Sequence, residues 1–268
     1  YIGRIDWTKA EAPVWGYPGT SAEFKITGRT LKLPVSNKNN YWANYLGCII
    51  DQSQQSYLLN REGETEFTIA VPENETNEHR VCFFKRQDAC HELTILDYEI
   101  GDGEALLPLE PVTGRRIEVY GDSVSAGEVS EAIDYIGVSD PVHNGAYSNS
   151  WYSYAWITAR KLHAQVHDVA QGGIALMDGI GWFREPNQIG MEQVWDKICY
   201  NPVLGRTSTW DFTRYMPQVV VVAIGQNDSH PYDFMKNDYA GVQAEQWREH
   251  YKKFLEKLRK TYPDAYII

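Results

Sequence analysis

Three short turns in the second half of the sequence carry residue types suited to one reaction. Ser123 stands in a Gly-Asp-Ser turn after a short apolar run, and Gly172-Gly173 follows a second segment, residues 164–169, that is predicted to be a strand. Asn227 stands in a Gly-Gln-Asn-Asp turn after a run of four valines. A serine hydroxyl becomes a nucleophile when a neighbouring base takes its proton. Backbone N–H groups and an asparagine amide are typical donors to the resulting oxyanion, so the three turns together predict acyl transfer.

The residues of these turns are expected to have separate roles. Ser123 is the candidate nucleophile. Its own N–H, the N–H of Gly173 and the side chain of Asn227 are the candidate oxyanion hole. Glycine suits this role because its backbone can approach a ligand closely. Gly172 is an alternative to Gly173, because the doubled glycine leaves the register open by one residue.

Each turn also has a purely structural interpretation. Short polar side chains are common in turns because they bond to the local backbone. We expect Asp122 to cap a helix or turn and Asp228 to bond the loop backbone, and we assign neither a chemical step. Three such turns at the ends of three successive predicted strands favour a site over three unrelated turns.

The elements that position these turns alternate between strand and helix. Strands are predicted over residues 115–120, 164–169 and within 216–225, and helices over about 148–163 and within 239–263. A fourth strand begins at 264–268. This alternation predicts a doubly wound α/β domain, in which reactive groups gather at the carboxyl ends of the parallel strands.

The first hundred residues follow a different pattern. Short β-branched or aromatic segments are separated by Gly, Asn, Pro or charged residues, which predicts a β-sandwich or jelly roll over residues 1–105. Residues 24–33 suggest a hairpin around Thr27-Gly28. Residues 101–114, rich in Gly, Pro and acid, are predicted to connect this domain to an α/β domain over 115–268.

Composition excludes some partners. With 25 Lys and Arg against 36 Asp and Glu, the net charge of −11 argues against nucleic acid and anionic membrane surfaces. No apolar stretch approaches the roughly 20 residues of a membrane span.

The four cysteines lack zinc-site spacing, so no metal is expected. Cys82 and Cys90 could close a disulfide, and buried thiols are an equal alternative.

The motifs resemble a known superfamily. GDSVSAG, a glycine after the second strand and GQND resemble the first three sequence blocks of the SGNH (GDSL) hydrolases, in order. With a β-sandwich ahead of that domain, the chain resembles carbohydrate esterase family 2 across essentially all its residues. YSNSWYSYAWITARKL and QGGIALM are similar to that family's passages between the first and second blocks.

The resemblance implies a fold, an activity and a set of roles. The α/β domain would be a flavodoxin-like, three-layer SGNH domain, with Ser123 as nucleophile and Ser123 N–H, Gly173 and Asn227 as oxyanion hole. Family members are microbial enzymes that remove O-acetyl groups from plant polysaccharides such as xylan and mannan.

The base is missing from the expected pattern. SGNH hydrolases carry a catalytic histidine in a late Asp-x-x-His block, and this sequence ends at Ile268 within its predicted fourth strand. His230 follows the Asn227 turn directly and is expected at the rim, and His143 could line the cleft. We therefore expect a truncated domain whose base lies beyond Ile268, which would make the fragment a poor esterase.

Several aromatic residues are candidate substrate contacts. Trp182 and Trp210 lie in the segment 178–215, which is long for a connection and is expected to border the binding site. These two tryptophans and His230 could contact a sugar, since a flat ring suits the apolar face of a pyranose. Packing beneath the loop is the alternative for both tryptophans.

The leading hypothesis is a serine esterase that deacetylates xylan or mannan without any metal or organic cofactor. The alternatives are a general GDSL esterase, lipase or thioesterase, and a carbohydrate-binding protein that has lost hydrolysis. An intact polysaccharide does not enter a cell, so we expect a secreted or cell-surface bacterial protein.

Overall fold

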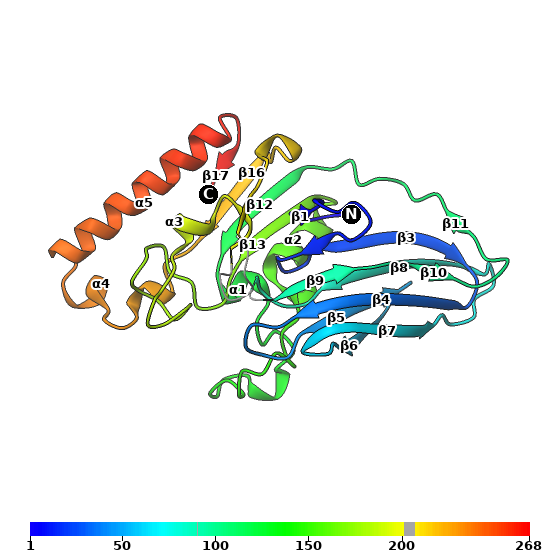
Figure 1. Ribbon diagram of the computed structural model, residues 1–268. Helices are drawn as coiled ribbons and strands as arrows, with labels where there is room; N and C mark the ends of the chain where they lie inside the picture. The colour runs from blue at the N-terminus through cyan, green and yellow to red at the C-terminus, as the bar shows by residue number, and fades with distance from the viewer. Residues whose placement is uncertain (90, 201–206) are drawn as a thin grey trace.

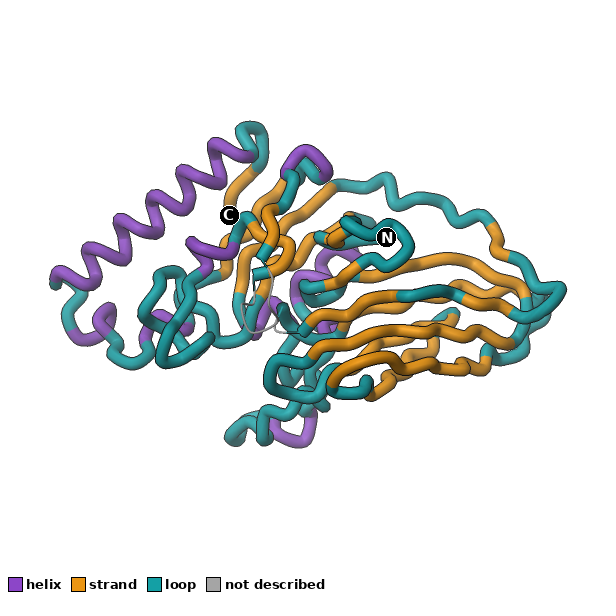
Figure 2. Tube along the Cα trace, viewed as in Figure 1, coloured by secondary structure: helices purple, strands orange, loops and turns teal. Residues whose placement is uncertain are grey.

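The computed structural model describes residues 1–89, 91–200 and 207–268. Antiparallel sheets made by the N-terminal part lie beside a parallel sheet that carries most of the helices (Figures 1 and 2). We refer to these regions as the β half and the α/β half.

The β half contains two antiparallel sheets. One has the strand order β1-β2-β9-β4-β10, with β7 also paired to β4, and the other has the order β11-β3-β8-β5-β6. Their strands are β1 (Ile5–Asp6), β2 (Val14–Trp15), β3 (Ser21–Thr27), β4 (Thr30–Lys38), β5 (Tyr45–Ile50), β6 (Ser53–Leu58), β7 (Glu62–Ala70), β8 (Glu78–Lys85), β9 (Glu92–Ile95), β10 (Glu99–Ile100) and β11 (Leu106–Leu107).

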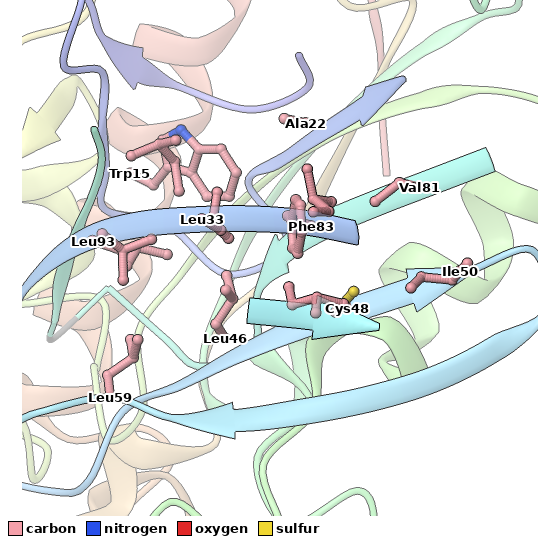
Figure 3. Close-up of a cluster of buried hydrophobic side chains, with 14 of the residues drawn as sticks. Trp15, Ala22, Leu33, Leu46, Cys48, Ile50, Leu59, Val81, Phe83 and Leu93 are labelled. Atoms are coloured by element: carbon pink, nitrogen blue, oxygen red, sulfur yellow. The ribbon is translucent and has the colours of Figure 1, made fainter. Parts of the chain in front are cut away.

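The two sheets share one hydrophobic core. Leu33 and Leu93 come from the first sheet, Leu46 and Phe83 come from the second, and all four are fully buried (Figure 3). Alternate residues of β4 point into this core, as a strand with one covered face requires. The predicted β-sandwich is therefore present, and the finer jelly-roll connectivity stays a prediction.

The predicted hairpin around Thr27-Gly28 is wrong. β3 pairs with β8 and β11, whereas β4 pairs with β7, β9 and β10, so the turn leads from one sheet to the other. In both strands, alternate residues point into the same core. This pattern fits two strands paired in a hairpin, and it fits equally well two strands that face each other from different sheets. Gly28 has φ +102, and Glu104 occupies the space that a β-carbon would need.

The α/β half is built on a parallel sheet with the order β13-β12-β16-β17. Its strands are β12 (Arg116–Gly121), β13 (Gln165–Ala170), β16 (Val219–Ala223) and β17 (Tyr266–Ile267), and a separate pair is formed by β14 (Lys197–Cys199) and β15 (Ser208–Thr209). Its helices are α1 (Ser123–Ala126), η1 (Ile133–Tyr135), η2 (Ser150–Tyr152), α2 (Tyr154–Lys161), α3 (Met191–Val194), η4 (Phe212–Arg214), η5 (Asn227–Ser229), α4 (Phe234–Asn237) and α5 (Val242–Thr261).

Helices α2 and α5 cover opposite faces of this sheet. Val119 of β12 packs in one cluster with Trp156 of α2. Its neighbour Tyr120 packs in another cluster with Phe254 and Leu258 of α5. Successive residues of a strand point to opposite faces, so one short strand serves both layers. The predicted strand-helix alternation is confirmed over these elements.

The predicted connection between the halves, residues 101–114, adds a strand to the β half. Its residues Leu106 and Leu107 form β11, which pairs with β3. From there the chain runs back along the β half to β12 (Figure 1). Of the predicted disulfide pair, Cys82 is buried and Cys90 lies outside the described residues. No helix within the described ranges has the length and apolar character needed to cross a membrane.

The N-terminal arm joins the halves through a buried charge. The Arg4 guanidinium donates from Nε and Nη2 to Glu118 Oε1 of β12, at 3.1 and 2.9 Å. Nη1 donates to the carbonyl oxygens of Trp195 and Lys197. Both side chains of the ion pair are 0% exposed, so the β half is anchored on the sheet that carries Ser123.

Candidate active site

The three predicted turns meet at one cavity of about 760 Å³. Ser123 follows β12, Gly172 and Gly173 follow β13, and Asn227 follows β16, and all four residues line this cavity. The three strands are adjacent and parallel, so their carboxyl ends lie at the same edge of the sheet. The prediction that these residues come together is met by the geometry, and their chemical roles stay predictions.

Ser123 is held at the first turn of α1. Asp122 caps this helix, because its Oδ1 accepts a hydrogen bond from Val124 N at 3.1 Å. Gly127, with φ +75, ends the helix after one turn. At Gly121 a β-carbon would lie 1.9 Å from Ser125 Oγ, so only glycine lets the strand turn so closely into the helix. The expected capping role of Asp122 is confirmed.

The two glycines of the second turn differ in what their backbone groups do. Gly172 N–H donates to Asp88 Oδ2 at 2.8 Å. Gly173 has φ +73, and its carbonyl oxygen accepts from Trp182 N and Phe183 N. No acceptor for Gly173 N–H is found among the described residues. Of the two glycines, Gly173 therefore has the N–H that is left for a ligand.

Asn227 begins η5 and is already hydrogen bonded. Its Nδ2 donates to Asp122 Oδ2 at 3.2 Å and to the carbonyl oxygen of Ile174 at 3.1 Å. These bonds fix the amide between the first and second turns. The next residue, Asp228, accepts from Leu176 N and Trp247 Nε1, which confirms its expected role in holding the loop.

Two carboxyl groups beside Ser123 have raised pKa values. Burial raises the pKa of Asp122 to about 6, and the nearby charge of Asp228 adds to the effect. Burial and then the charge of Asp88 raise the pKa of Glu128 to about 7. Perturbed carboxyl groups of this kind cluster at functional sites, because catalysis needs groups that titrate near the working pH.

None of the described histidines hydrogen bonds with Ser123. His143 lines the cavity, and its Nδ1 lies 2.6 Å from Glu128 Oε1. His230 stacks on Trp182 with ring centroids 3.3 Å apart, and its Nε2 lies 3.3 Å from Glu185 Oε1. His230 thus packs on Trp182, which lines the cavity, but is not itself among the lining residues, so its predicted contact with a substrate stays a prediction.

The two candidate tryptophans have different environments. Trp182 is 57% exposed and lines the cavity, where its ring is available to a ligand. Trp210 is 4% exposed, packs against His167 and Tyr215, and lies in a core cluster. The prediction that Trp210 contacts a substrate is therefore corrected, since its ring is covered by other side chains.

One wall of the cavity was missed by the sequence analysis. Asn40, Tyr41 and Trp42 of the β half line it, opposite residues of the α/β half. Residues 41 and 42 have the aromatic composition of a strand, but β5 begins only at Tyr45. The signal that could have found them is the aromatic pair directly after two asparagines, a turn-forming composition.

Comparisons with known proteins show similarity to carbohydrate esterases. A family model described as carbohydrate esterase 2 N-terminal matches residues 1–109. The chain is 27% identical to the cellulase/esterase CelE of Acetivibrio thermocellus, covering all of this chain and 30% of that protein. It is 28% identical to an acetylxylan esterase / glucomannan deacetylase of Cellvibrio japonicus, of which it covers 69%.

Solved structures give the same result. The chain superposes on a family two carbohydrate esterase from Clostridium thermocellum in complex with cellohexaose with a TM-score of 0.81 and 26% identity, covering 100% of this chain and 75% of that one. A family two carbohydrate esterase from Cellvibrio japonicus gives 0.80 and 25%, with 99% and 73% covered. The resemblance that the motifs indicate is thus confirmed: the chain is similar, over its whole length, to the family 2 carbohydrate esterases.

Proposed function

We propose that the chain carries the nucleophile and oxyanion hole of a serine esterase that removes O-acetyl groups from plant polysaccharides of the xylan or mannan type. The observation that carries this proposal is the meeting of Ser123, Gly173 and Asn227 at one cavity. The acetylxylan esterase / glucomannan deacetylase among the similar proteins supports the substrate class.

The proposed reaction has two steps. Ser123 Oγ attacks the acetyl carbonyl carbon while a histidine base takes the hydroxyl proton, and the sugar alcohol leaves with that proton. The bond between the acetyl carbon and the sugar oxygen breaks as the alcohol leaves, and the acetyl group remains as an ester on Ser123. In the second step water hydrolyses this ester, which releases acetate and restores the serine hydroxyl. Both steps pass through a tetrahedral oxyanion, so the same donors lower both barriers.

We propose that three groups donate hydrogen bonds to that oxyanion. They are the N–H groups of Ser123 and Gly173 and the amide of Asn227. The hydrogen bonds from Asn227 Nδ2 to Asp122 and to the Ile174 carbonyl hold the amide in place. An oxyanion would share the amide hydrogens with these two acceptors. One such donor typically contributes about 3 kcal/mol to lowering the barrier.

We propose that the base is a histidine outside these 268 residues. The arrangement of the described histidines supports this, since none of them hydrogen bonds with Ser123. His143 is the rival within the chain, because it lines the cavity and is oriented by the Glu128 carboxylate in the way a catalytic base is oriented. His143→Ala distinguishes the two.

Aromatic rings on both sides of the cavity support a sugar ligand. Tyr41 and Trp42 extend from the β half and Trp182 from the α/β half. A polysaccharide substrate also places the protein outside the cell or on its surface. A second candidate function is carbohydrate binding without hydrolysis, and the esterase solved with cellohexaose supports the carbohydrate-binding part of it.

Acetate release tests these proposals. We expect a protein that contains these residues together with its base to release acetate from acetylated xylan or mannan. Ser123→Ala should abolish release, His143→Ala should preserve it, and long-chain esters should react slowly. Fast hydrolysis of long-chain esters would favour the general esterase, and oligosaccharide binding without acetate release would favour the binding protein. Loss of activity in His143→Ala would make His143 the base.

A further inference from the structure

A segment of the β half reaches the oxyanion turn. At the end of β8, the fully buried Lys85 donates from Nζ to the carbonyl oxygens of Gln87 and Asp88. Ala89 N–H then donates to the carbonyl oxygen of Ala170, the last residue of β13. The backbone of Asp88 is therefore fixed on both sides, next to the turn that contains Gly172 and Gly173.

The carboxylate of Asp88 binds this turn at two points. Its Oδ2 accepts from Gly172 N–H at 2.8 Å and from Gln171 Nε2 at 2.7 Å. Tyr41 OH, from the cavity wall, donates to the same oxygen at 3.4 Å. Asp88 is 4% exposed, so water competes little for these donors. Hydrogen bonds from a backbone N–H to a charged acceptor are shorter and stronger than those between neutral groups.

This arrangement decides which of the two glycines, both of which line the cavity, has an N–H left for a ligand. Because Gly172 N–H is bound by Asp88, the turn cannot rotate to present it to a ligand without losing that bond. A β-carbon at Gly172 would lie 2.7 Å from Asp88 Oδ2 and 2.8 Å from Glu128 Oε2, so the turn is enclosed on that side. Gly173, with φ +73, then carries the next N–H, for which the described residues provide no acceptor.

We propose that Asp88, a residue of the β half, is a positioning residue for the oxyanion hole. By accepting hydrogen bonds from Gly172 N–H and the Gln171 side chain, it fixes the turn so that Gly173 N–H donates to the oxyanion. This inference rests on the proposed esterase function. It also gives the β half a role in catalysis. A residue of the β half, Asp88, would orient the Gly173 N–H, which belongs to the α/β half and acts on the substrate.

Three variants test the proposal. Asp88→Ala removes the acceptor. Asp88→Asn retains a neutral oxygen acceptor. Asp51→Ala is the matched control, because Asp51 accepts the N–H of Arg80 within the β half and does not line the cavity. Acetate release is measured in a protein that includes the base, and amide hydrogen exchange at Gly172 and Gly173 is measured by NMR in the 268-residue chain.

We expect Asp88→Ala to lower kcat about 100-fold with KM changed less than about threefold, because a displaced donor acts on the transition state more than on substrate binding. Gly172 N–H should exchange faster in this variant. Asp88→Asn should stay within about tenfold of the wild-type kcat and keep Gly172 protected, since an amide oxygen still accepts. Asp51→Ala should match the wild type in both measurements.

Two results would overturn the proposal. One is Asp88→Ala with the kcat and the Gly172 exchange rate of Asp51→Ala. The other is an Asp88→Asn variant in which Gly172 N–H is still protected from exchange but kcat falls as much as expected for Asp88→Ala. If Asp88→Ala does not fold, the Asp88→Asn variant alone decides. If the wild-type protein releases no acetate at all, the proposed function fails, whereas Gly172 exchange still reports whether Asp88 fixes the turn.

Discussion

Glu118 and Asp122 lie four residues apart, at the middle of β12 and just after its end, and have contrasting environments. Glu118 is fully buried and accepts hydrogen bonds from Arg4, Tyr120 and Tyr262, so its charge is compensated on every side. Asp122 contacts Val124 and Asn227, carries no counter-ion in these bonds and has a pKa of about 6. The middle of the strand thus uses its acid to join the two halves, and the end of the strand uses its acid to orient the site.

Removing the counter-ion of Glu118 should have the largest effect on stability. Arg4→Met leaves a buried carboxylate without its cation, which we expect to lower the free energy of unfolding by about 3–5 kcal/mol. The matched control is Arg29→Met, whose ion pair with Glu73 is 63% and 69% exposed and should change stability by less than about 1 kcal/mol. Urea unfolding measures both, and equal effects of the two variants would contradict a structural role for the Arg4–Glu118 pair.

Removing the partner of Asp122 should affect catalysis instead. Asn227→Ala deletes one proposed oxyanion donor, so we expect kcat for acetate release to fall about 100- to 1000-fold with little change in KM. Asn74→Ala, which removes an amide bonded to the Glu78 carbonyl in the β half, serves as the control. A rise in KM with unchanged kcat would show that Asn227 binds substrate and does not stabilise the transition state.

The charge of Asp122 should make stability depend on pH. Its pKa is raised from 3.8 to about 6 in the folded protein, so the folded state holds a proton that the unfolded chain releases first. This contribution to stability is fully present below about pH 4 and is lost as the pH rises through about 6.

Asp122→Asn removes this titration and keeps an oxygen acceptor for Val124 N–H. We expect the variant to be more stable than the wild type at pH 7 by about 1–2 kcal/mol, since solvent screens part of the charge. The difference should shrink toward pH 4. Unfolding curves at several pH values measure it, and a difference that stays constant with pH would contradict the assignment.

The smallest expected effect concerns the exposed tryptophan of the cavity. Trp182→Ala should weaken xylo- or manno-oligosaccharide binding about fivefold, which corresponds to roughly 1 kcal/mol, and should leave stability nearly unchanged. Tyr239→Ala, at an exposed ring outside the cavity lining, is the control for calorimetric titration. Equal binding by both variants would remove Trp182 from the sugar site.

The sequence predicted the α/β half and its three turns because strand and helix patterns alternate along it, and each turn of glycine or polar residues comes after a predicted strand. It did not predict which strands are neighbours in the β half. Alternation in β3 and β4 indicates that both face a core, but it does not say whether they lie beside or opposite each other. The hairpin at Thr27-Gly28 was wrong for this reason.

The sequence analysis also did not predict the site residues that come from the β half. The aromatic pair after two asparagines could have marked Tyr41 as a turn residue, but no local pattern shows that Tyr41 and Asp88 lie near Gly172. That proximity arises only from the packing of the two halves. The positions of Trp182 and Trp210 could not be separated either, because both lie in irregular segments and only tertiary packing covers one of them. Ser123 and Asn227 were found because their chemistry and their place at strand ends are both local features.

Covalent labelling tests most directly whether Ser123 is an activated nucleophile. A protein that continues beyond Ile268 to include the proposed base is treated with a fluorophosphonate, and adducts are located by peptide mass spectrometry. We predict one adduct, on the peptide that contains Ser123, and none in Ser123→Ala. A folded protein that binds oligosaccharides but gains no adduct at Ser123 would contradict the esterase and favour a carbohydrate-binding protein.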